Sequence, residues 1–577
     1  ANTASTQDGS ITNPYLNIGA AIRNATGTTC IVVMPGEYVT PIVLDSSNIH
    51  IFSYNSVTGT DYPESILYVS GQYLAGTGIQ LVDSIIFNRN AGIYFDGATN
   101  SSVNGFAFVH SNTEDGLPRQ AVFFDGATNS TLFNNQIGTF TFDSVNYTGW
   151  TNGDETLVTV YDSDSITVLE NEFYGNTIGV SANNRLDTVI SVLNSGAFAT
   201  PVDVVRNRIQ SNTAITQRQA AGSNYWATLL YSGNSYTNVV GNEFVQNTAS
   251  TILSSRTPDL GNEEFNVISN VFLNNTTDVS LNVGDTNILA GALVQLYHTP
   301  QFIFANNTVV ENDFDESGEN GAMIGLGTPR QVSGPTDFDT SLVGSVASFA
   351  FVNNLVFNNT WNNLGAGLVT TTSPQAISDC QSLTGVADEA AQYNWWYDYD
   401  GTFDQFDACY FDFTDGFNFN LAYTANDPES DFVGNLPGST LDPLTDPAFY
   451  ALIEEAEGIY SRGIDYSSIT SIDNDVNVID LTDPTLSYGL DTNGEVRETD
   501  VIPWEGFTDG DNNPSVYTMD VGAFEFRELT IAVDDFSYEF YPELDSFLED
   551  EPFIVINLDD RVSGGVGEIT FDVVTPP

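Results

Sequence analysis

The chain has 577 residues, of which 41% are apolar and 15% are charged, so it can bury more than one ordinary core. Its 76 acidic residues face only 13 basic ones, all of them arginine, and the formal net charge is −63. Such a charge repels phosphate backbones and anionic lipid headgroups, which excludes nucleic acid as a partner. No apolar run reaches the ~18 residues of a membrane span, so we expect no membrane insertion.

The N-terminal residues predict a capped end of a stack of strands. Residues 17–23 form a short amphipathic stretch, and strands follow in residues 30–38, 42–44 and 48–52. A helical turn before the first strands would cover an open end whose unpaired edges otherwise promote aggregation. Cys30 begins an apolar run, so we expect it to be a small buried hydrophobe.

A tripeptide Asn-x-(Phe/Ile/Val) then repeats after β-branched runs, with steps of 31, 36, 36, 35, 28, 37 and 47 residues. Its asparagines are Asn104, Asn135, Asn171, Asn207, Asn242, Asn270, Asn307 and Asn354. A period of this size is typical of repeat architectures, and the short strands between polar turns favour a β-solenoid with stacked coils. We expect the asparagines to form a ladder in which each amide bonds to its neighbours in the stack.

The same alignment predicts two further columns of side chains. Asp96-Gly-Ala-Thr-Asn-Ser recurs at Asp125, and Asp162 occupies the corresponding position in the next coil. Six coils also carry an aromatic residue about ten positions before the repeated asparagine. These aromatic residues would stack in a column, which we interpret as buried core rather than as a sugar-binding platform. These aromatic residues are Phe95, Phe124, Tyr161, Phe198, Tyr231 and Tyr297.

Three interpretations of Asp96, Asp125 and Asp162 stay open. Unscreened carboxylates about 4.8 Å apart would repel one another, and a bound cation such as Ca²⁺ would relieve this. A pair of carboxylates is also the catalytic machinery of glycosidases. Alternatively, each aspartate caps its own Asp-Gly type of turn. Further acidic loops could hold Ca²⁺, above all the one containing Asp509 and Asp511.

Basic residues offer little catalytic chemistry in this sequence. Lysine is absent, which excludes a lysine base, and arginine is the remaining candidate for proton abstraction. We expect the coil arginines to form salt bridges on the acidic surface; they are Arg185, Arg206, Arg208, Arg218 and Arg256. The three histidines, His50, His110 and His298, lie outside catalytic motifs and are expected to be structural.

The rhythm of the repeat fails near residue 366. Cys380 and Cys409 flank a loop-rich insertion containing Trp395 and Trp396, and a disulfide between the cysteines is expected in an oxidising compartment. Residues 447–457 predict a helix, and residues 519–526 predict a strand. Residues 528–577 predict strands of an open β-sandwich. We therefore expect a β-helix with its cap in 1–365, an irregular closing segment in 366–527 and a sandwich module in 528–577.

Residues 17–365, with their Asn-x-Phe repeats and Ile31-Val-Val-Met-Pro-Gly-Glu-Tyr38, resemble the right-handed parallel β-helix superfamily of pectate lyases and secreted surface proteins. Asp491-Thr-Asn-Gly-Glu-Val-Arg497 and Asp520-Val-Gly-Ala-Phe-Glu525 resemble the closing signature of anchored bacterial and archaeal β-helix surface proteins. Val533-Asp-Asp535 and Glu549-Asp-Glu551 resemble the start of a cadherin-like or Ig-like module. The resemblance implies an all-β fold and leaves the role of the protein open.

From these observations we expect a non-catalytic protein at the cell surface or secreted, stabilised by Ca²⁺, within a filament, sheath or adhesin. Its partners would be further copies or neighbouring surface subunits. The alternative is a polysaccharide lyase, hydrolase or polysaccharide-binding β-helix, so enzymatic activity stays uncertain. Asn-x-Ser/Thr sequons permit glycosylation at several asparagines; they are Asn24, Asn100, Asn129, Asn146, Asn274, Asn275, Asn306 and Asn358.

Overall fold

The computed structural model describes most of the repeat region and short parts of the C-terminal third. The described residues are 9–10, 13–39, 42–54, 65–69, 79–80, 86–87, 91–110, 120–140, 155–178, 186–197, 199–214, 226–256, 264–277, 292–297, 299, 301–314, 322–326, 348–361, 369–371, 395–397, 421–422, 432, 435–436, 438–451, 502–508, 514–517 and 523.

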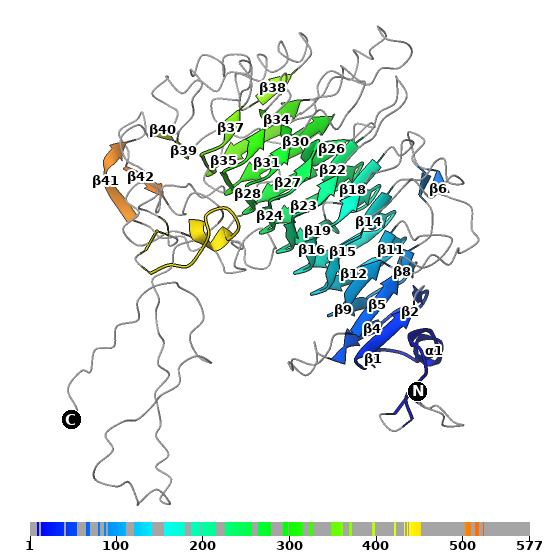
Figure 1. Cartoon of the computed structure of the whole chain (residues 1–577). Helices are drawn as coiled ribbons and strands as arrows, with labels where there is room; N and C mark the ends of the chain where they lie inside the picture. The colour runs from blue at the N-terminus through cyan, green and yellow to red at the C-terminus, as the bar shows by residue number, and fades with distance from the viewer. Residues whose placement is uncertain are drawn as a thin grey trace, which may run out of the picture.

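Strands stack into three long parallel sheets, here named I, II and III, and a short parallel sheet IV (Figure 1). The strands alternate in the order sheet III, sheet I, sheet II along most of the chain, and six coils add a short strand to sheet IV. Every strand pairs with the equivalent strand of the neighbouring coil. The predicted all-β fold, a right-handed parallel β-helix, is confirmed.

The strand bounds follow this order in every sheet. Sheet I contains β1 (Thr29–Val33), β4 (Ile49–Ser53), β9 (Ser102–Asn104), β12 (Thr128–Phe133), β15 (Asp164–Leu169), β19 (Val202–Val205), β23 (Thr237–Val240), β27 (Glu264–Ile268), β31 (Gln301–Ala305) and β35 (Ser348–Val352). Sheet II contains β2 (Gly36–Val39), β5 (Ser65–Val69), β10 (Ala107–His110), β13 (Gln136–Gly138), β16 (Glu172–Tyr174), β20 (Arg208–Gln210), β24 (Glu243–Val245), β28 (Val271–Leu273), β32 (Thr308–Val310), β36 (Leu355–Phe357), β39 (Trp395–Tyr397) and β40 (Leu421–Ala422). Sheet III contains β3 (Ile42–Leu44), β8 (Ala91–Asp96), β11 (Gln120–Asp125), β14 (Glu155–Tyr161), β18 (Leu186–Leu193), β22 (Trp226–Gly233), β26 (Thr251–Arg256), β30 (Ala292–Tyr297), β34 (Ala322–Leu326) and β38 (Val369–Thr371). Sheet IV contains β17 (Thr177–Ile178), β21 (Thr213–Ala214), β25 (Thr248–Ala249), β29 (Thr276–Thr277), β33 (Asp313–Phe314) and β37 (Thr360–Trp361).

The N-terminal end of the stack is closed by a helix, as predicted. Helix α1 (Ile18–Asn24) buries Ile18 and Ile22 against the first coil, and the Asn17 side chain accepts a hydrogen bond from the Ala20 N–H. The prediction for Cys30 is wrong, because the thiol is exposed. Strand β1 alternates along its length, so Ile31 points inward and Cys30 points to solvent.

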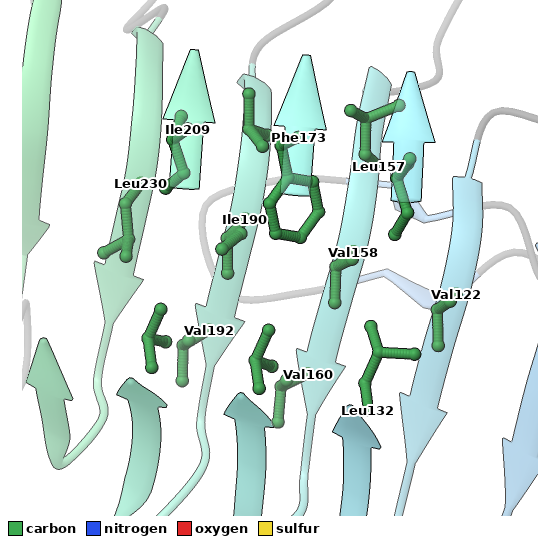
Figure 2. Packing of buried hydrophobic residues seen from close by; sticks show 14 of the residues in the cluster. Val122, Leu132, Leu157, Val158, Val160, Phe173, Ile190, Val192, Ile209 and Leu230 are labelled. Atoms are coloured by element: carbon green, nitrogen blue, oxygen red, sulfur yellow. The ribbon is translucent and has the colours of Figure 1, made fainter. Parts of the chain in front are cut away.

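The interior of the coils is a continuous apolar core. Figure 2 shows branched side chains of successive coils, such as Val158 and Ile190, lying side by side on neighbouring strands in a row that runs along the stack. Phe95 and Phe124 stack with ring centroids 4.2 Å apart and are fully buried. The interpretation of the aromatic column as core is therefore confirmed for this pair. Burial of each such side chain contributes about 1.5–3 kcal/mol.

An asparagine ladder ties successive coils together at the corner between sheets I and II. The amide of Asn135 donates to Asn171 Oδ1 at 2.9 Å, and Asn171 donates to Asn207 at 3.0 Å. The same bond continues through Asn242, Asn270, Asn307 and Asn354 at distances up to 3.1 Å. The ladder prediction is confirmed for these seven residues.

Asn104 does not belong to this ladder. It pairs with Phe133, two residues before Asn135, and the backbone N–H of Phe106 bonds to Asn135 Oδ1 instead. The repeated tripeptide therefore misaligned the first member by two residues, because Asn104-Gly-Phe resembles the motif without occupying its corner.

A second asparagine ladder runs parallel to the first at the corner between sheets II and IV. Its amides donate to the next side-chain oxygen at 2.8–3.1 Å; its members are Asn176, Asn212, Asn247, Asn275, Asn312 and Asn359. Each lies five residues after a member of the first ladder, so the sequence pattern Asn-x₄-Asn contains the signal. The repeated tripeptide alone does not reveal it, because it marks only one asparagine in each coil.

Left-handed residues make these sharp corners possible. The residue before each ladder asparagine has a positive φ: Glu170 (52°) and Arg206 (49°) precede first-ladder members, and Gly175 (60°) and Ser211 (54°) precede second-ladder members. A single left-handed residue turns the chain while the next side chain points inward, where a buried amide must find partners. The ladders supply those partners.

Short described segments from the C-terminal part of the chain pack on the outer face of sheet II. Phe432, Phe449 and Tyr450 pack on outward-facing residues of β24, β28, β32 and β36, and the Ala523 N–H bonds to Thr308 Oγ1 at 2.9 Å. The predicted helix at 447–457 is a 3₁₀ turn at Pro447–Tyr450, and Ala451 has extended backbone. Residues 452–457 lie outside the described residues.

Three further features complete the described chain. Strands β38, β39 and β40 extend sheets II and III beyond residue 365. Two antiparallel pairs lie outside the coils, β6 (Ile79–Gln80) with β7 (Ile86–Phe87) and β41 (Ile502–Thr508) with β42 (Pro514–Tyr517).

Residues 528–577, where we predict a β-sandwich module, lie outside the described residues. Within the described part, no helix is long and apolar enough to cross a bilayer.

Candidate functional site on the outer face of sheet III

The outer face of sheet III carries the predicted aspartate column, but with a different membership. Asp96 pairs directly with Asp125, whereas Asp125 pairs with Tyr161 rather than with Asp162. The predicted alignment of Asp162 is therefore wrong by one residue. Asp45 follows Leu44, which pairs with Phe95, so the register brings Asp45 beside Asp96 instead.

Asp162 lies in a turn and is not part of this row. Its φ is +48°, and its N–H donates to the carbonyl of Leu193. The equivalent residue one coil earlier is Gly126, with φ +63° and an N–H that donates to Tyr161. Aspartate tolerates this left-handed position better than most residues, which explains why Asp replaces Gly there.

The predicted aromatic column also ends after two coils. Phe124 pairs with Val160, while Tyr231 pairs with Ser191 and Ser254 in a different row on the outer face. Counting back from the repeated asparagine located these aromatic residues without fixing the face of the strand on which they lie. A shift of one residue moves a side chain to the opposite face. Phe198 lies outside the described residues, and Tyr297 pairs with Arg256.

Asp125 is engaged by a tyrosine on the neighbouring coil. Tyr94 OH donates to Asp125 Oδ2, and the Tyr94 ring stacks on Phe123 with centroids 5.4 Å apart. Ala91 completes this small apolar cluster outside the main core. Asp96 is exposed, so the carboxylate pair has one solvated member and one member anchored by a phenol.

The row Asp45, Asp96 and Asp125 runs along the stacking axis and does not converge on one point. Steps of about 4.8 Å per strand place its two ends about 10 Å apart. In keeping with this, no three His, Cys, Asp or Glu residues of the described ranges are grouped so that they could hold a metal ion. A cation could therefore bind only between two adjacent carboxylates, with water or other groups as further ligands.

Farther along the same face, small hydroxyl residues line the sheet in two rows. The motif Thr-x-x-(Thr/Ser/Tyr) produces them in four successive strands, at Thr156, Thr188, Thr228 and Thr251 and three residues after each. These residues point away from the core and are nevertheless buried, with at most 4% exposed. The motif is visible in the sequence, but a spacing of three places residues on opposite faces of a regular strand, so it does not predict a shared face.

Several of these buried polar groups lack a hydrogen-bond partner. Thr188 Oγ1, Ser191 Oγ, Ser254 Oγ and both amide atoms of Gln120 have none within the described part of the chain. Leaving such groups unsatisfied costs about 1–3 kcal/mol each, so they usually bond to water or to a ligand. Because these side chains are fully buried, the partners that fit them are water molecules or polar groups inside the fold rather than a large ligand at the surface.

A separate charged cluster lies where the C-terminal segment crosses sheet II. Arg208 forms an ion pair with Glu243 at 3.1 Å and donates to the carbonyl of Thr445 at 3.2 Å. Burial raises the pKa of Glu243; Arg208 opposes that shift and Asp446 adds to it. Arg206 pairs with Glu170 at 2.6 Å, so the salt-bridge prediction is confirmed for two arginines.

The remaining predicted residues are only partly described. His50 Nδ1 lies 3.0 Å from Ser102 Oγ, in keeping with a structural role. The residues Arg185, Arg218, His298, Cys380, Cys409, Asp509 and Asp511 lie outside the described residues, so the disulfide and the second calcium loop stay predictions.

Comparisons with known proteins add a fold likeness only. No family model matches, and no curated protein matches. Among solved structures, the pectate lyase Pel9A is 13% identical, with 81% of this chain and 91% of that chain covered and a TM-score of 0.39. An alginate lyase from Paenibacillus sp. str. FPU-7 is 13% identical over 62% of this chain and 95% of its own, with a TM-score of 0.27. PfbA, a surface adhesin of Streptococcus pneumoniae, is 11% identical over 61% and 89%, with a TM-score of 0.26. At this level the likeness carries no argument about activity.

Proposed function

We propose that this chain is a non-catalytic extracellular protein that serves as a rod in a filament, sheath or adhesin. The observation that supports it best is the pair of asparagine ladders, which connect coils at two corners from Asn135 to Asn359. Because each coil contacts only its neighbours, continuous side-chain ladders stiffen the stack along its axis. Such a rod can display loops at a distance from an anchored end.

Calcium would serve this rod as a counter-ion. The net charge of −63 opposes close approach of copies, and an extracellular divalent cation reduces that repulsion. Asp96 and Asp125 are adjacent carboxylates on the outer face and are the first site that we propose for Ca²⁺. Asp162, Asp509 and Asp511 stay candidates for further sites. The proposed partners are other copies or neighbouring surface subunits.

Two measurements on the purified full chain test this proposal. Electron microscopy with and without Ca²⁺ should show elongated particles and, with Ca²⁺, end-to-end or lateral assemblies. Incubation with acidic polysaccharides should yield no new unsaturated or reducing ends. Turnover that is lost in Asp125→Ala and kept in the exposed control Asp164→Ala would overturn the proposal in favour of an enzyme.

A second candidate function is the binding of a polysaccharide along sheet III. The neighbouring carboxylates of Asp96 and Asp125 on the outer face favour it, because they can accept hydrogen bonds from sugar hydroxyls. Titration of soluble polysaccharides, with Asp96→Ala and Asp125→Ala as variants, tests it. Affinity that falls in these variants and not in an exposed-surface control would support binding; equal affinity in all would contradict it.

A further inference from the structure

The seven sequons whose asparagines the structure describes differ sharply in what the fold allows; the eighth, at Asn146, lies outside the described residues. Asn275 and Asn306 are fully buried at the coil corners, where Asn275 is a ladder member, so neither can carry a glycan in the folded chain. The amide of Asn274 donates to the Leu444 carbonyl, and that of Asn358 donates to Glu311. Both are only partly exposed. Because a glycan is bulky and needs a free surface, these four positions are disfavoured.

Three described sequons have exposed asparagines: Asn24, Asn100 and Asn129. The Asn24 amide donates to the Ala20 carbonyl at 2.8 Å, at the end of α1. The Asn100 amide donates to Asn48 Oδ1 at 2.6 Å, and the hydroxyl of its sequon partner Ser102 lies 3.0 Å from His50 Nδ1. In each of these two sequons at least one reacting group is already engaged.

Asn129 differs from both. Among the described residues, neither its amide nor the hydroxyl of Thr131 makes a hydrogen bond, and Asn129 is exposed at the corner between sheets III and I. Its φ of +48° lifts the side chain out of the strand path, and asparagine is a residue that tolerates this backbone. The neighbouring coil brings Asn100 alongside, since Thr99 pairs with Thr128.

We infer that Asn129 is an N-glycosylation site. The donor would be an oligosaccharide linked through a phosphate to a lipid carrier, delivered by an oligosaccharyl transferase. The Asn129 amide nitrogen bonds to the anomeric carbon, the bond from that carbon to the phosphate oxygen breaks, and the lipid phosphate leaves with the electron pair. The amide loses one proton to the transferase base. The inference rests on the proposed extracellular location, where such modification occurs.

The test uses the full chain, incubated with a membrane-bound oligosaccharyl transferase and a lipid-linked oligosaccharide, followed by peptide mass spectrometry. We expect the glycan on the peptide containing Asn129, with Asn100 and Asn24 unmodified. Asn129→Asp, which suits the left-handed backbone, and Thr131→Ala should remove it, whereas Thr131→Ser and Ser102→Ala should retain it. Modification that falls mainly on Asn100 or Asn24, or an unmodified Asn129 beside a glycosylated reporter peptide, would overturn the inference.

The outcome is separable from that of the proposed function. Assembly and turnover are measured on unmodified protein, so an unmodified Asn129 leaves the rod proposal intact. Conversely, a chain that cleaves polysaccharide could still carry the glycan. Unchanged thermal unfolding of Asn129→Asp distinguishes loss of the acceptor from loss of the fold.

Discussion

Substitution of one interior ladder residue, Asn207→Ala, tests how much of the stack depends on its side-chain ladders. Asn207 Oδ1 accepts from the backbone N–H of Asn171 at 2.9 Å and from the Asn171 amide at 3.0 Å. Its own amide donates to Val168 O, Val205 O and Asn242 Oδ1 at 2.8, 3.1 and 3.0 Å. Asn207 itself is fully buried, so water does not replace these bonds.

The loss can be estimated group by group. In Asn207→Ala the buried N–H of Asn171 loses its acceptor, which costs about 1–3 kcal/mol, and at least one further net hydrogen bond is lost, at about 0.5–1.5 kcal/mol. We therefore expect the free energy of unfolding to fall by about 2–4 kcal/mol. Because the coil contacts only its neighbours, the damage should be local to coils carrying Asn171 and Asn242.

Urea denaturation and amide hydrogen exchange measure the two parts of this expectation. The control is Gln136→Ala, which removes an exposed amide side chain from a strand of the same stack and should change stability by less than about 0.5 kcal/mol. Faster exchange should appear at the Asn171 N–H and fade in distant coils. Asn207→Leu separates hydrogen bonding from packing: if Leu restored wild-type stability, burial rather than the ladder would hold the corner, and the stabilising role of the ladder would be refuted.

Three further predictions concern calcium, pH and backbone conformation. Saturating Ca²⁺ should raise the melting temperature, because a concentration of 100 times the dissociation constant stabilises the folded chain by about 2.7 kcal/mol. In a thermal scan, Asp125→Asn should lose most of that shift, and equal shifts in both proteins would exclude this site. The pKa of Glu243 is raised in the folded chain, so its contribution to stability is present below the ordinary glutamate range and is lost as pH rises through the folded pKa. The difference in free energy of unfolding between wild type and Glu243→Gln should therefore fall over that pH window. A difference that does not change with pH would contradict this prediction. Gly126 has a φ of +63° and open space where a methyl group would lie, so Gly126→Ala should lower the free energy of unfolding by about 1–2 kcal/mol through the backbone alone. The midpoint of urea denaturation measures this loss, and an unchanged midpoint would contradict a strained corner.

The sequence predicted the stack because its strongest constraint is periodic. A buried asparagine that bonds to its equivalent in the next coil must recur once per coil, so Asn171 and Asn207 stand 36 residues apart in sequence and one strand apart in space. The predicted register of side chains on the outer face of sheet III was wrong. Nothing inside the coil fixes whether an aspartate ends a strand, as Asp125 does, or turns a corner, as Asp162 does.

The same division explains why the role of the chain is harder to infer than its fold. Stacking energy resides in inward side chains and corner amides, which tolerate few alternatives because each buried polar group needs its partner. Outward residues of sheet III do not take part in the stacking contacts of the core. Thr188, Ser191 and Ser254 are buried there as polar groups without partners among the described residues. Ordered water commonly satisfies buried polar groups of this kind, so these hydroxyls do not by themselves reveal a ligand. Alanine substitution of Ser191 tests whether its hydroxyl has a water partner: a gain in the free energy of unfolding would show that the hydroxyl is unsatisfied, and a loss would show that it bonds to buried water.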